Sequence, residues 1–223
     1  MDILIVGAGG HGKVVLDIIR AEGKHRVVGF LDADPARSGA NIHGIDVLGQ
    51  INLLPKLKSK ARAAIVAIGD NRTRASYAQI IKQQGFELVS AVHPKANVAA
   101  TARLGASVVI AAGAVVGADA QLEDCVIVNS LAVVEHECAI GPGAHICPAA
   151  ALAGRVSVGE EAFVGLGSRV IQCLNIGRQS IVGAGAVVIA DVPDFATVVG
   201  VPARVIKIGG AADAPATAEI CQV

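Results

Sequence analysis

Aromatic residues are scarce in this 223-residue chain, which has no tryptophan, one tyrosine and four phenylalanines although 53% of its residues are hydrophobic. Any hydrophobic core must therefore be built from valine, isoleucine, leucine and alanine. The 26 glycines among these small aliphatic residues indicate a tightly wound, repetitive backbone rather than a core of mixed large side chains. The length allows one large domain or two small ones.

An excess of charge is also missing, since 19 basic residues balance 19 acidic ones and no run of Lys or Arg occurs. A nucleic-acid partner would need such a cluster, so we expect none. Uncharged stretches stay short of the roughly 20 residues of a membrane span. The five cysteines contain no CxxC pair, which favours reduced thiols. Together with the lack of a basic-then-apolar leader, these features predict a cytoplasmic protein without a membrane span.

Strand-like and helix-like segments alternate over residues 1–92. Apolar runs predict strands at residues 3–6, 27–31, 63–68 and 87–92, and the segments at 13–22 and 72–84 are typical of helices. Strands separated by helices predict a small parallel α/β sheet with right-handed crossovers.

The first predicted strand leads into GAGGHG at residues 7–12, which has the G-x-G-x-x-G spacing of a dinucleotide-binding turn. Free amides at the start of the next helix would bind phosphate oxygens, and Asp32 is placed for a ribose or base contact. His11 could add a hydrogen bond to phosphate or sugar. A dehydrogenase and a simple tight turn are the alternatives. Because residues 1–92 are only half of a full dinucleotide fold, we favour a diphosphate that belongs to a substrate.

From Val98 onward the chain repeats every six residues. One hexad position is Leu, Ile or Val sixteen times in succession, from Val98 to Val188, and the position four places later is mostly small. This period predicts a parallel β-helix with three hexads to each triangular coil, in which the aliphatic side chains fill the interior. Glycine often follows the aliphatic residue, where we expect it to supply unusual backbone angles. Residues 196–207 leave this register, and the Ala-rich tail at 209–223 is expected to be disordered.

Two histidines of the repeat, His136 and His145, occupy no inward position, so both are expected to point outward. Imidazole titrates near neutral pH and can remove a proton from an amine that attacks a thioester. Glu137 or Glu135 could assist His136, although Glu137 reaches it only if a bend intervenes, because neighbours on a strand face opposite ways. Nine residues are half a coil, so the two histidines lie on different sides of the prism. They could share one site only between packed chains, which favours an oligomer. Surface histidines without a role are the simpler alternative.

Two rival chemistries are less favoured. An acyl-cysteine intermediate could use Cys147, which lies close to His145 in the sequence, whereas Cys138 occupies an inward small position and is expected in the core. A zinc site would need three histidine ligands, and the repeat holds two. We therefore expect no metal.

The hexads and the closing GVPAR at residues 200–204 resemble the left-handed β-helix acyltransferases. With GAGGHGKVV at 7–15, AIGDNRTR at 67–74, HPKA at 93–96 and VVEHECAIG at 133–141, the chain is similar to the nucleotide-sugar N-acetyltransferases that act on 4-amino-4,6-dideoxysugars. Sialic acid O-acetyltransferases are neighbours of this family. The resemblance implies a Rossmann-like α/β domain at residues 1–92, a left-handed parallel β-helix of hexapeptide repeats at 93–208, and a tail at 209–223.

The family further implies a homotrimer for cell-surface glycan biosynthesis, with acetyl-CoA in the groove between adjacent β-helices and a UDP- or GDP-linked amino sugar as acceptor. It implies a catalytic base at His136, assisted by Glu137. The acetyl-CoA contacts fall on His145, Leu166 and Ala184. The nucleotide-sugar contacts fall on Gly9, Gly10, His11, Asp32 and Gly69. Some relatives carry a second Asp where this chain has Ala33. At this position the resemblance does not specify how the chain binds the nucleotide. Sugar O-acetylation and a non-catalytic, nucleotide-sensing trimeric scaffold remain alternatives.

Overall fold

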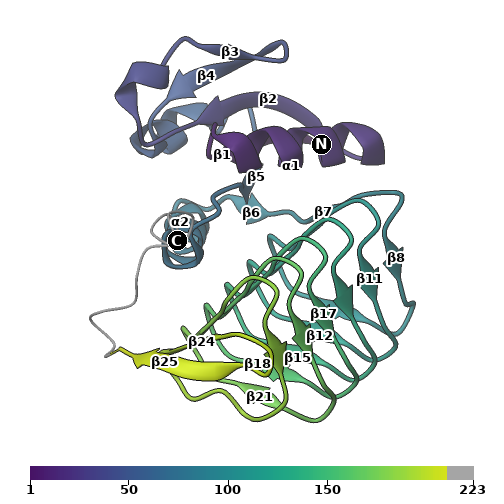
Figure 1. The fold of residues 1–223 in the computed structure, drawn as a ribbon. Coiled ribbons are helices and arrows are strands. Elements are labelled where there is room, and N and C mark those ends of the chain that lie inside the picture. The colour runs from purple at the N-terminus through teal and green to yellow at the C-terminus, as the bar shows by residue number, and fades with distance from the viewer. Residues whose placement is uncertain (210–223) are drawn as a thin grey trace.

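The computed structural model describes residues 1–209, and it places an α/β domain against one side of a triangular β-helix (Figure 1). The helices are α1 (Gly10–Glu22) and α2 (Asn71–Gln83), with 3-10 helices at Pro35–Arg37 and Ile51–Leu57. The strands of this domain are β1 (Asp2–Val6), β2 (Arg26–Leu31), β3 (Asn41–Ile42), β4 (Ile45–Gly49), β5 (Ala63–Val66) and β6 (Glu87–Leu88). Their order is β3-β4-β2-β1-β5-β6, and the pairs are parallel except β3 with β4.

The sheet of the α/β domain is buried on both faces, because helices cover each side. Ile3 and Ile5 pack in one cluster with α1, whereas Leu4 and Val6 pack in another with residues of α2. Helix α1 also packs on the β-helix, since its cluster includes Val109. The predicted alternation of strands and helices is confirmed, and the structure adds a hairpin of β3 and β4 between the second and third predicted strands, with Val47 in the core.

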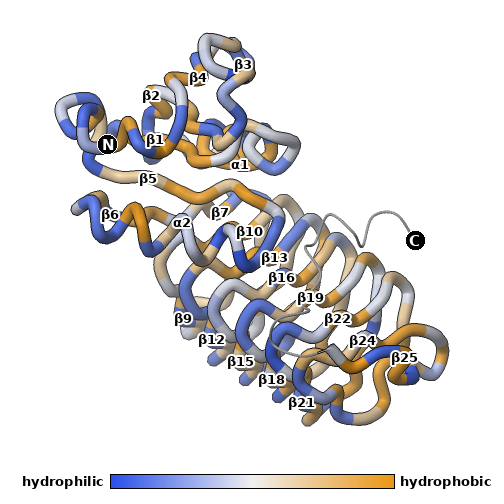
Figure 2. The backbone as a smooth tube through the Cα atoms, turned by 90° about the vertical axis from the view of Figure 1, so that its left-hand side faces the viewer, coloured by the Kyte–Doolittle hydropathy of each residue, from blue (hydrophilic) through white to orange (hydrophobic). Residues whose placement is uncertain are grey.

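Three sheets form the β-helix, all of their pairs are parallel except β24 with β25, and their coils stack as Figure 2 shows. The first prism sheet contains β7 (Ala91–Val92), β10 (Val109–Ile110), β13 (Ile127–Val128), β16 (His145–Ile146), β19 (Phe163–Val164), β22 (Ile181–Val182), β24 (Ala196–Val199) and β25 (Arg204–Ile208). The second contains β8 (Asn97–Val98), β11 (Val115–Val116), β14 (Val133–Val134), β17 (Ala151–Leu152), β20 (Arg169–Val170) and β23 (Val187–Val188). The third contains β9 (Arg103–Leu104), β12 (Gln121–Leu122), β15 (Ala139–Ile140), β18 (Ser157–Val158) and β21 (Asn175–Ile176).

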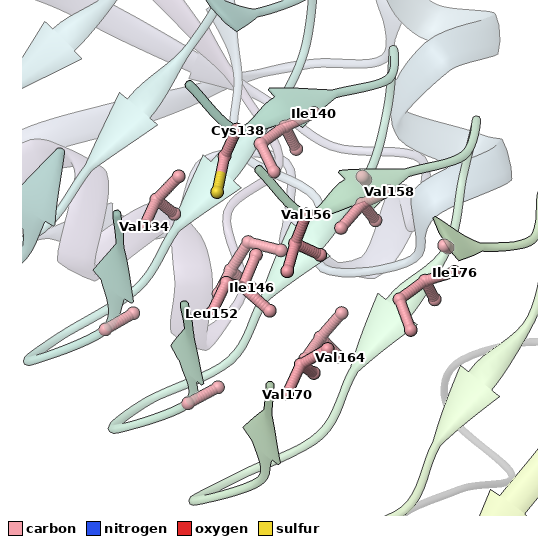
Figure 3. Close-up of a cluster of buried hydrophobic side chains, with 14 of the residues drawn as sticks. Val134, Cys138, Ile140, Ile146, Leu152, Val156, Val158, Val164, Val170 and Ile176 are labelled. Carbon is pink, nitrogen blue, oxygen red and sulfur yellow. The ribbon is translucent and has the colours of Figure 1, made fainter. Parts of the chain in front are cut away.

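The strand register confirms the predicted coil, because Val109 pairs with Ile127 and Ile127 with His145, three hexads apart each time. The aliphatic column fills the interior, as the inward side chains of Val134, Ile146 and Ile176 illustrate (Figure 3). Leu104 is an exception at 38% exposure, and Val98 is only partly buried. Both lie on the outermost strand of their sheets, where no further coil covers them.

The expected role of the glycines that follow the aliphatic residue is wrong. Gly159, for example, is not among the glycines with positive φ, and a Cβ there would lie 2.5 Å from the backbone nitrogen of Arg178 in the next coil. These glycines are needed because successive coils approach closely at this position. The left-handed φ angles occur elsewhere in the hexad, directly before the small residue, as at Glu137 (+57°) and Arg155 (+60°).

The segments around the repeat are partly as expected. The predicted strand at 87–92 divides into β6 of the α/β sheet and β7, which pairs with β10 of the prism. The division of the chain after residue 92 stays a prediction. Residues 196–207 leave the hexad register as predicted, and β24 pairs antiparallel with β25. The predicted tail lies outside the described residues beyond Gly209. No helix within the described part of the chain is long and apolar enough to cross a membrane.

Candidate active site

His136 and Glu137 lie between β14 and β15, at the edge where the second and third prism sheets meet. The left-handed φ of Glu137, +57°, is the bend that brings neighbouring side chains together. His136 Nδ1 is 3.0 Å from Glu137 Oε2. The imidazole points outward as predicted, with 53% of the side chain exposed. Glu137, rather than Glu135, is therefore the acid in contact with this ring.

The charges around Glu137 favour one form of the histidine. Arg155, one coil later, donates from Nε to Glu137 Oε2 at 3.0 Å. The Arg155 guanidinium and then His136 hold the pKa of the Glu137 carboxyl below its usual value. A carboxylate accepts hydrogen bonds only, so the neutral His136 ring carries its proton on Nδ1. Its Nε2 lone pair is then available to accept a proton from a substrate.

His145, at the start of β16, points outward from the prism but is buried, with 8% exposure, because the α/β domain covers the first prism sheet. The ring of Phe163 packs against it edge to face, with centroids 5.4 Å apart. Asn129 Oδ1 accepts the Ser130 amide, so Asn129 Nδ2 donates to His145 Nε2 at 3.0 Å. The proton of the neutral ring is therefore on Nδ1, which has no partner within residues 1–209. Burial and then the charge of Arg74 hold the pKa of His145 well below its usual value.

Leu166 and Ala184 lie one coil apart at the edge between the first and second prism sheets. Leu166 is 56% exposed, and Leu131 at the same edge is exposed as well. Gly167 and Gly185 beside them leave open space. We call Leu131, Leu166 and Ala184 the leucine edge. It is apolar, exposed and separate from the edge that carries His136, with the second prism sheet between them.

The GAGGHG turn joins β1 to α1, and its glycines explain its tight geometry. Gly7 has a φ of +111°, and a Cβ on Gly12 would collide with the carbonyl of Gly7. Gly9 is the N-cap of α1, no side chain caps the helix there, and a Cβ on Gly9 or Gly10 would meet open space. The amides of the first helical turn therefore present a site that fits phosphate oxygens.

His11 lies in that first turn and is largely buried, and burial followed by the charge of Arg74 lowers its pKa to about 4. Its Nε2 has no hydrogen-bond partner among the described residues. The ring is thus neutral at pH 7, and it lies close enough to His145 that a charge on His11 would lower the pKa of His145. A buried ring nitrogen without a partner among the described residues, next to the open space at Gly9 and Gly10, fits a polar ligand there.

Asp32 and Gly69 follow β2 and β5, the two strands that flank β1, so both lie at the same end of the sheet as the GAGGHG turn. Asp32 Oδ2 accepts the amide of Ala8 at 2.7 Å, and its Oδ1 accepts the amide of Asp34 at 3.0 Å. Asp32 therefore also shapes the turn from within. Parallel sheets bind ligands at this carboxyl end.

Two arginines near this end were not singled out from the sequence. Arg74 on α2 is fully buried and donates to the carbonyls of Gly69, Cys125 and Gly143, among others. It lies within the AIGDNRTR motif, which was the available signal. Arg37 Nη1 donates to the Ala8 carbonyl at 2.9 Å and its Nε lies 3.9 Å from Asp32 Oδ1. Nothing in the spacing of the sequence indicated that contact.

The rival chemistries find little support in the geometry. Cys138 is buried in the prism, which confirms the core position predicted for it (Figure 3). Cys147 is buried as well, so its sulfur is out of reach of a thioester in this conformation. Within residues 1–209, no three His, Cys, Asp or Glu side chains gather in a group that could hold a metal ion.

Comparisons with known proteins agree with this architecture. The family model of the PglD N-terminal domain matches residues 2–89. The structure of PerB from Caulobacter crescentus in complex with CoA and GDP-perosamine is 44% identical, with a TM-score of 0.88, over 93% of this chain and 98% of that chain. The acetyltransferase domain of PglB from Neisseria gonorrhoeae in complex with acetyl coenzyme A is 38% identical, with a TM-score of 0.87, over 92% of this chain and 98% of that chain.

A more distant structure, WeeI from Acinetobacter baumannii, is 21% identical over 92% of this chain and 100% of that chain, with a TM-score of 0.63, and shows the shared fold. The identity to PerB and PglB over nearly the whole chain confirms the family that the motifs predicted. The chain belongs to the nucleotide-sugar N-acetyltransferases of the left-handed β-helix, hexapeptide-repeat family, which are acetyl-CoA-dependent enzymes.

Proposed function

We propose that this enzyme transfers the acetyl group of acetyl-CoA to the 4-amino group of a GDP-linked 4-amino-4,6-dideoxysugar, with His136 as general base. The observation that carries the base assignment is the contact of 3.0 Å between His136 Nδ1 and Glu137, which leaves Nε2 unprotonated and exposed. GDP is favoured over UDP because PerB, whose structure holds GDP-perosamine, is 44% identical to this chain.

The proposed reaction is a direct transfer. The amine nitrogen of the sugar attacks the thioester carbonyl, the new C–N bond forms, and His136 Nε2 takes the proton that the nitrogen loses. The C–S bond then breaks, and the thiolate of CoA receives that proton from His136. Glu137 stabilises the imidazolium between the two proton transfers. No protein nucleophile is needed, consistent with the burial of Cys147.

The leucine edge supports an acetyl-CoA site at Leu166 and Ala184, because exposed apolar side chains beside glycines fit the pantetheine arm. His145 is proposed to contribute to this site through its protonated Nδ1. The nucleotide sugar is assigned to Gly9, Gly10, His11, Asp32 and Gly69. Helix amides supply hydrogen bonds to the diphosphate there.

We further propose a homotrimer that acts in the cytoplasm. The support for the trimer is that His136 and the leucine edge lie on separate edges of one prism, so a complete site needs the leucine edge of another copy. The face between them carries Val115, Val133 and Val187, which are partly buried and apolar. Apolar faces of this kind are typical of subunit interfaces.

The test is an acetyl-CoA consumption assay with GDP-, UDP- and dTDP-linked 4-amino-4,6-dideoxysugars, with sialic acid as the O-acceptor. We expect turnover with the GDP-linked sugar and a product heavier by one acetyl group. His136→Ala should lower kcat by about 100- to 10,000-fold without changing the oligomeric state. His43→Asn, at an exposed histidine of the α/β domain, is the matched control. Turnover with sialic acid alone, or a near-normal His136→Ala enzyme, would overturn the proposal.

A further inference from the structure

The coil that follows His136 places two residues directly against the His136–Glu137 pair. Gly154 and Arg155 stand 18 positions after His136 and Glu137, and the backbone amide of Arg155 donates to the carbonyl of His136 at 3.0 Å. The stacking of coils therefore fixes the four residues in one register. We infer that Gly154 and Arg155 are positioning residues for His136, an inference that rests on the proposed role of His136 as base.

Gly154 provides the space that the imidazole occupies. A Cβ on Gly154 would lie 2.5 Å from Cε1 of His136 and would also collide with Nε2. Real Cβ atoms do not approach other atoms so closely, so the ring would have to turn away. Gly154 is not among the glycines with positive φ, so alanine suits its backbone. Because the obstructing group is a mobile surface side chain, this substitution moves the ring and leaves the coil intact.

Arg155 acts through Glu137. Both Arg155 Nε and His136 Nδ1 lie 3.0 Å from the same oxygen, Glu137 Oε2. Arg155 thus holds the Glu137 carboxylate in the orientation in which it accepts a hydrogen bond from His136. Its positive charge also offsets part of the negative charge of Glu137, so Glu137 stabilises the protonated form of His136 less strongly. A base must release its proton again after each transfer, so this partial compensation favours turnover.

Other charged and titratable groups at this edge come from the same coil and its neighbours. They are Asp119 from the coil before, Glu135 on the same coil, and Cys173 from the second coil after. Glu137, and after it Cys173, raise the pKa of the Arg155 guanidinium above its usual value. Arg155 is the cation among these groups, so its removal makes the charge around the ring more negative.

The test compares Arg155→Met, Arg155→Lys and Gly154→Ala in the full-length enzyme. Arg155→Met should lower kcat about 10-fold with KM unchanged. It should also shift the acid limb of the pH profile of kcat upward by about 0.2 to 0.7 unit, because Glu137 then stabilises the protonated ring without compensation. Arg155→Lys should restore part of kcat. Gly154→Ala should lower kcat about 100-fold, since the reacting nitrogen is displaced.

Arg178→Met is the matched control, because Arg178 Nε pairs with Asp194 Oδ2 at 3.1 Å in a similar exposed ion pair on another edge. It should leave kcat and the pH profile unchanged. Arg155→Met behaving like Arg178→Met, or Gly154→Ala keeping full turnover, would overturn the inference.

Ring ¹⁵N chemical shifts after selective histidine labelling give a readout that is independent of turnover. In the parent enzyme the neutral His136 ring should carry its proton on Nδ1, and Arg155→Met should shift the population toward the Nε2 tautomer. If His136→Ala proves active while this tautomer change still occurs, the role as base fails and the positioning contact stands. An unchanged tautomer in Arg155→Met would overturn the contact itself.

Discussion

The buried guanidinium of Arg74 donates from Nε to the carbonyl of Cys125 at 2.8 Å, so helix α2 of the α/β domain is fastened to the prism. The same side chain reaches Ile68, Gly69 and Gly143 through its other nitrogens. It also donates to the side chain of Asn71, and the charges of Asp70 and Glu161 partly offset the effect of burial on its pKa. Burial lowers the pKa of Arg74 to about 10, which leaves it charged at neutral pH.

Arg74→Met should therefore destabilise the protein. The change leaves several buried carbonyls without donors, and we expect the free energy of unfolding to fall by about 3 kcal/mol. Urea unfolding at a fixed protein concentration measures it. Arg72→Met, on the exposed side of the same helix, is the control and should stay within about 0.5 kcal/mol. Equal stability of the two variants would contradict the fastening role of Arg74.

Stability should fall between about pH 6.5 and pH 4 because of His11. Its folded-state pKa is lowered to about 4, whereas an unfolded histidine titrates near 6.5. Between these two pH values His11 binds a proton in the unfolded chain and stays neutral in the folded chain. The stability present above pH 6.5 is therefore lost as the pH falls. The loss is on the order of 3 kcal/mol by pH 4, and His145, shifted in the same direction, adds to it.

His11→Asn should flatten that profile, as measured by urea unfolding at pH 5 and pH 7.5. His43→Asn removes an exposed histidine and should leave the slope as it is in the parent protein. A slope that His11→Asn does not change would show that the lost stability comes from other groups.

Gly159→Ala should destabilise the β-helix, because its Cβ would lie 2.5 Å from the backbone nitrogen of Arg178 and the backbone cannot move aside. Overpacking of this kind costs about 1 to 3 kcal/mol. Gly154→Ala meets a surface side chain instead and should change the unfolding free energy by less than about 0.5 kcal/mol. Denaturant unfolding of the two variants side by side tests whether backbone contact is the reason for the glycine, and similar values would argue against it.

Asp32→Asn should weaken GDP binding about tenfold, as measured by calorimetry. Both carboxylate oxygens of Asp32 accept hydrogen bonds from backbone amides, those of Ala8 and Asp34. In asparagine an NH₂ group replaces one of these oxygens, so one backbone amide would face another donor and lose its hydrogen bond. The GAGGHG turn would then lose part of its support. Asp46→Asn, at an exposed pair with Asn41, is the control. Unchanged GDP affinity in Asp32→Asn would remove Asp32 from the proposed nucleotide site.

Much of the fold and the family followed from local patterns. The hexad column predicted the coil length and the register of the three prism sheets, because a period of six residues admits few other backbones. The GAGGHG turn, AIGDNRTR and VVEHECAIG predicted the family. The sequence also predicted that His136 points outward and that Cys138 lies in the interior, since each hexad position has a fixed direction.

Other features depended on contacts between segments far apart in the chain. The burial of His145 required the α/β domain to cover the first prism sheet, and the pairing of His136 with Glu137 required the left-handed corner at Glu137. Arg155 could have been found from the coil length, because it stands one coil after Glu137, but its contact with the carboxylate depends on side-chain geometry. A repeat determines whether the side chain of each residue points into the prism or out of it. Only the tertiary structure decides which groups surround that side chain, because burial, hydrogen bonds and pKa shifts come from neighbours that no local pattern specifies.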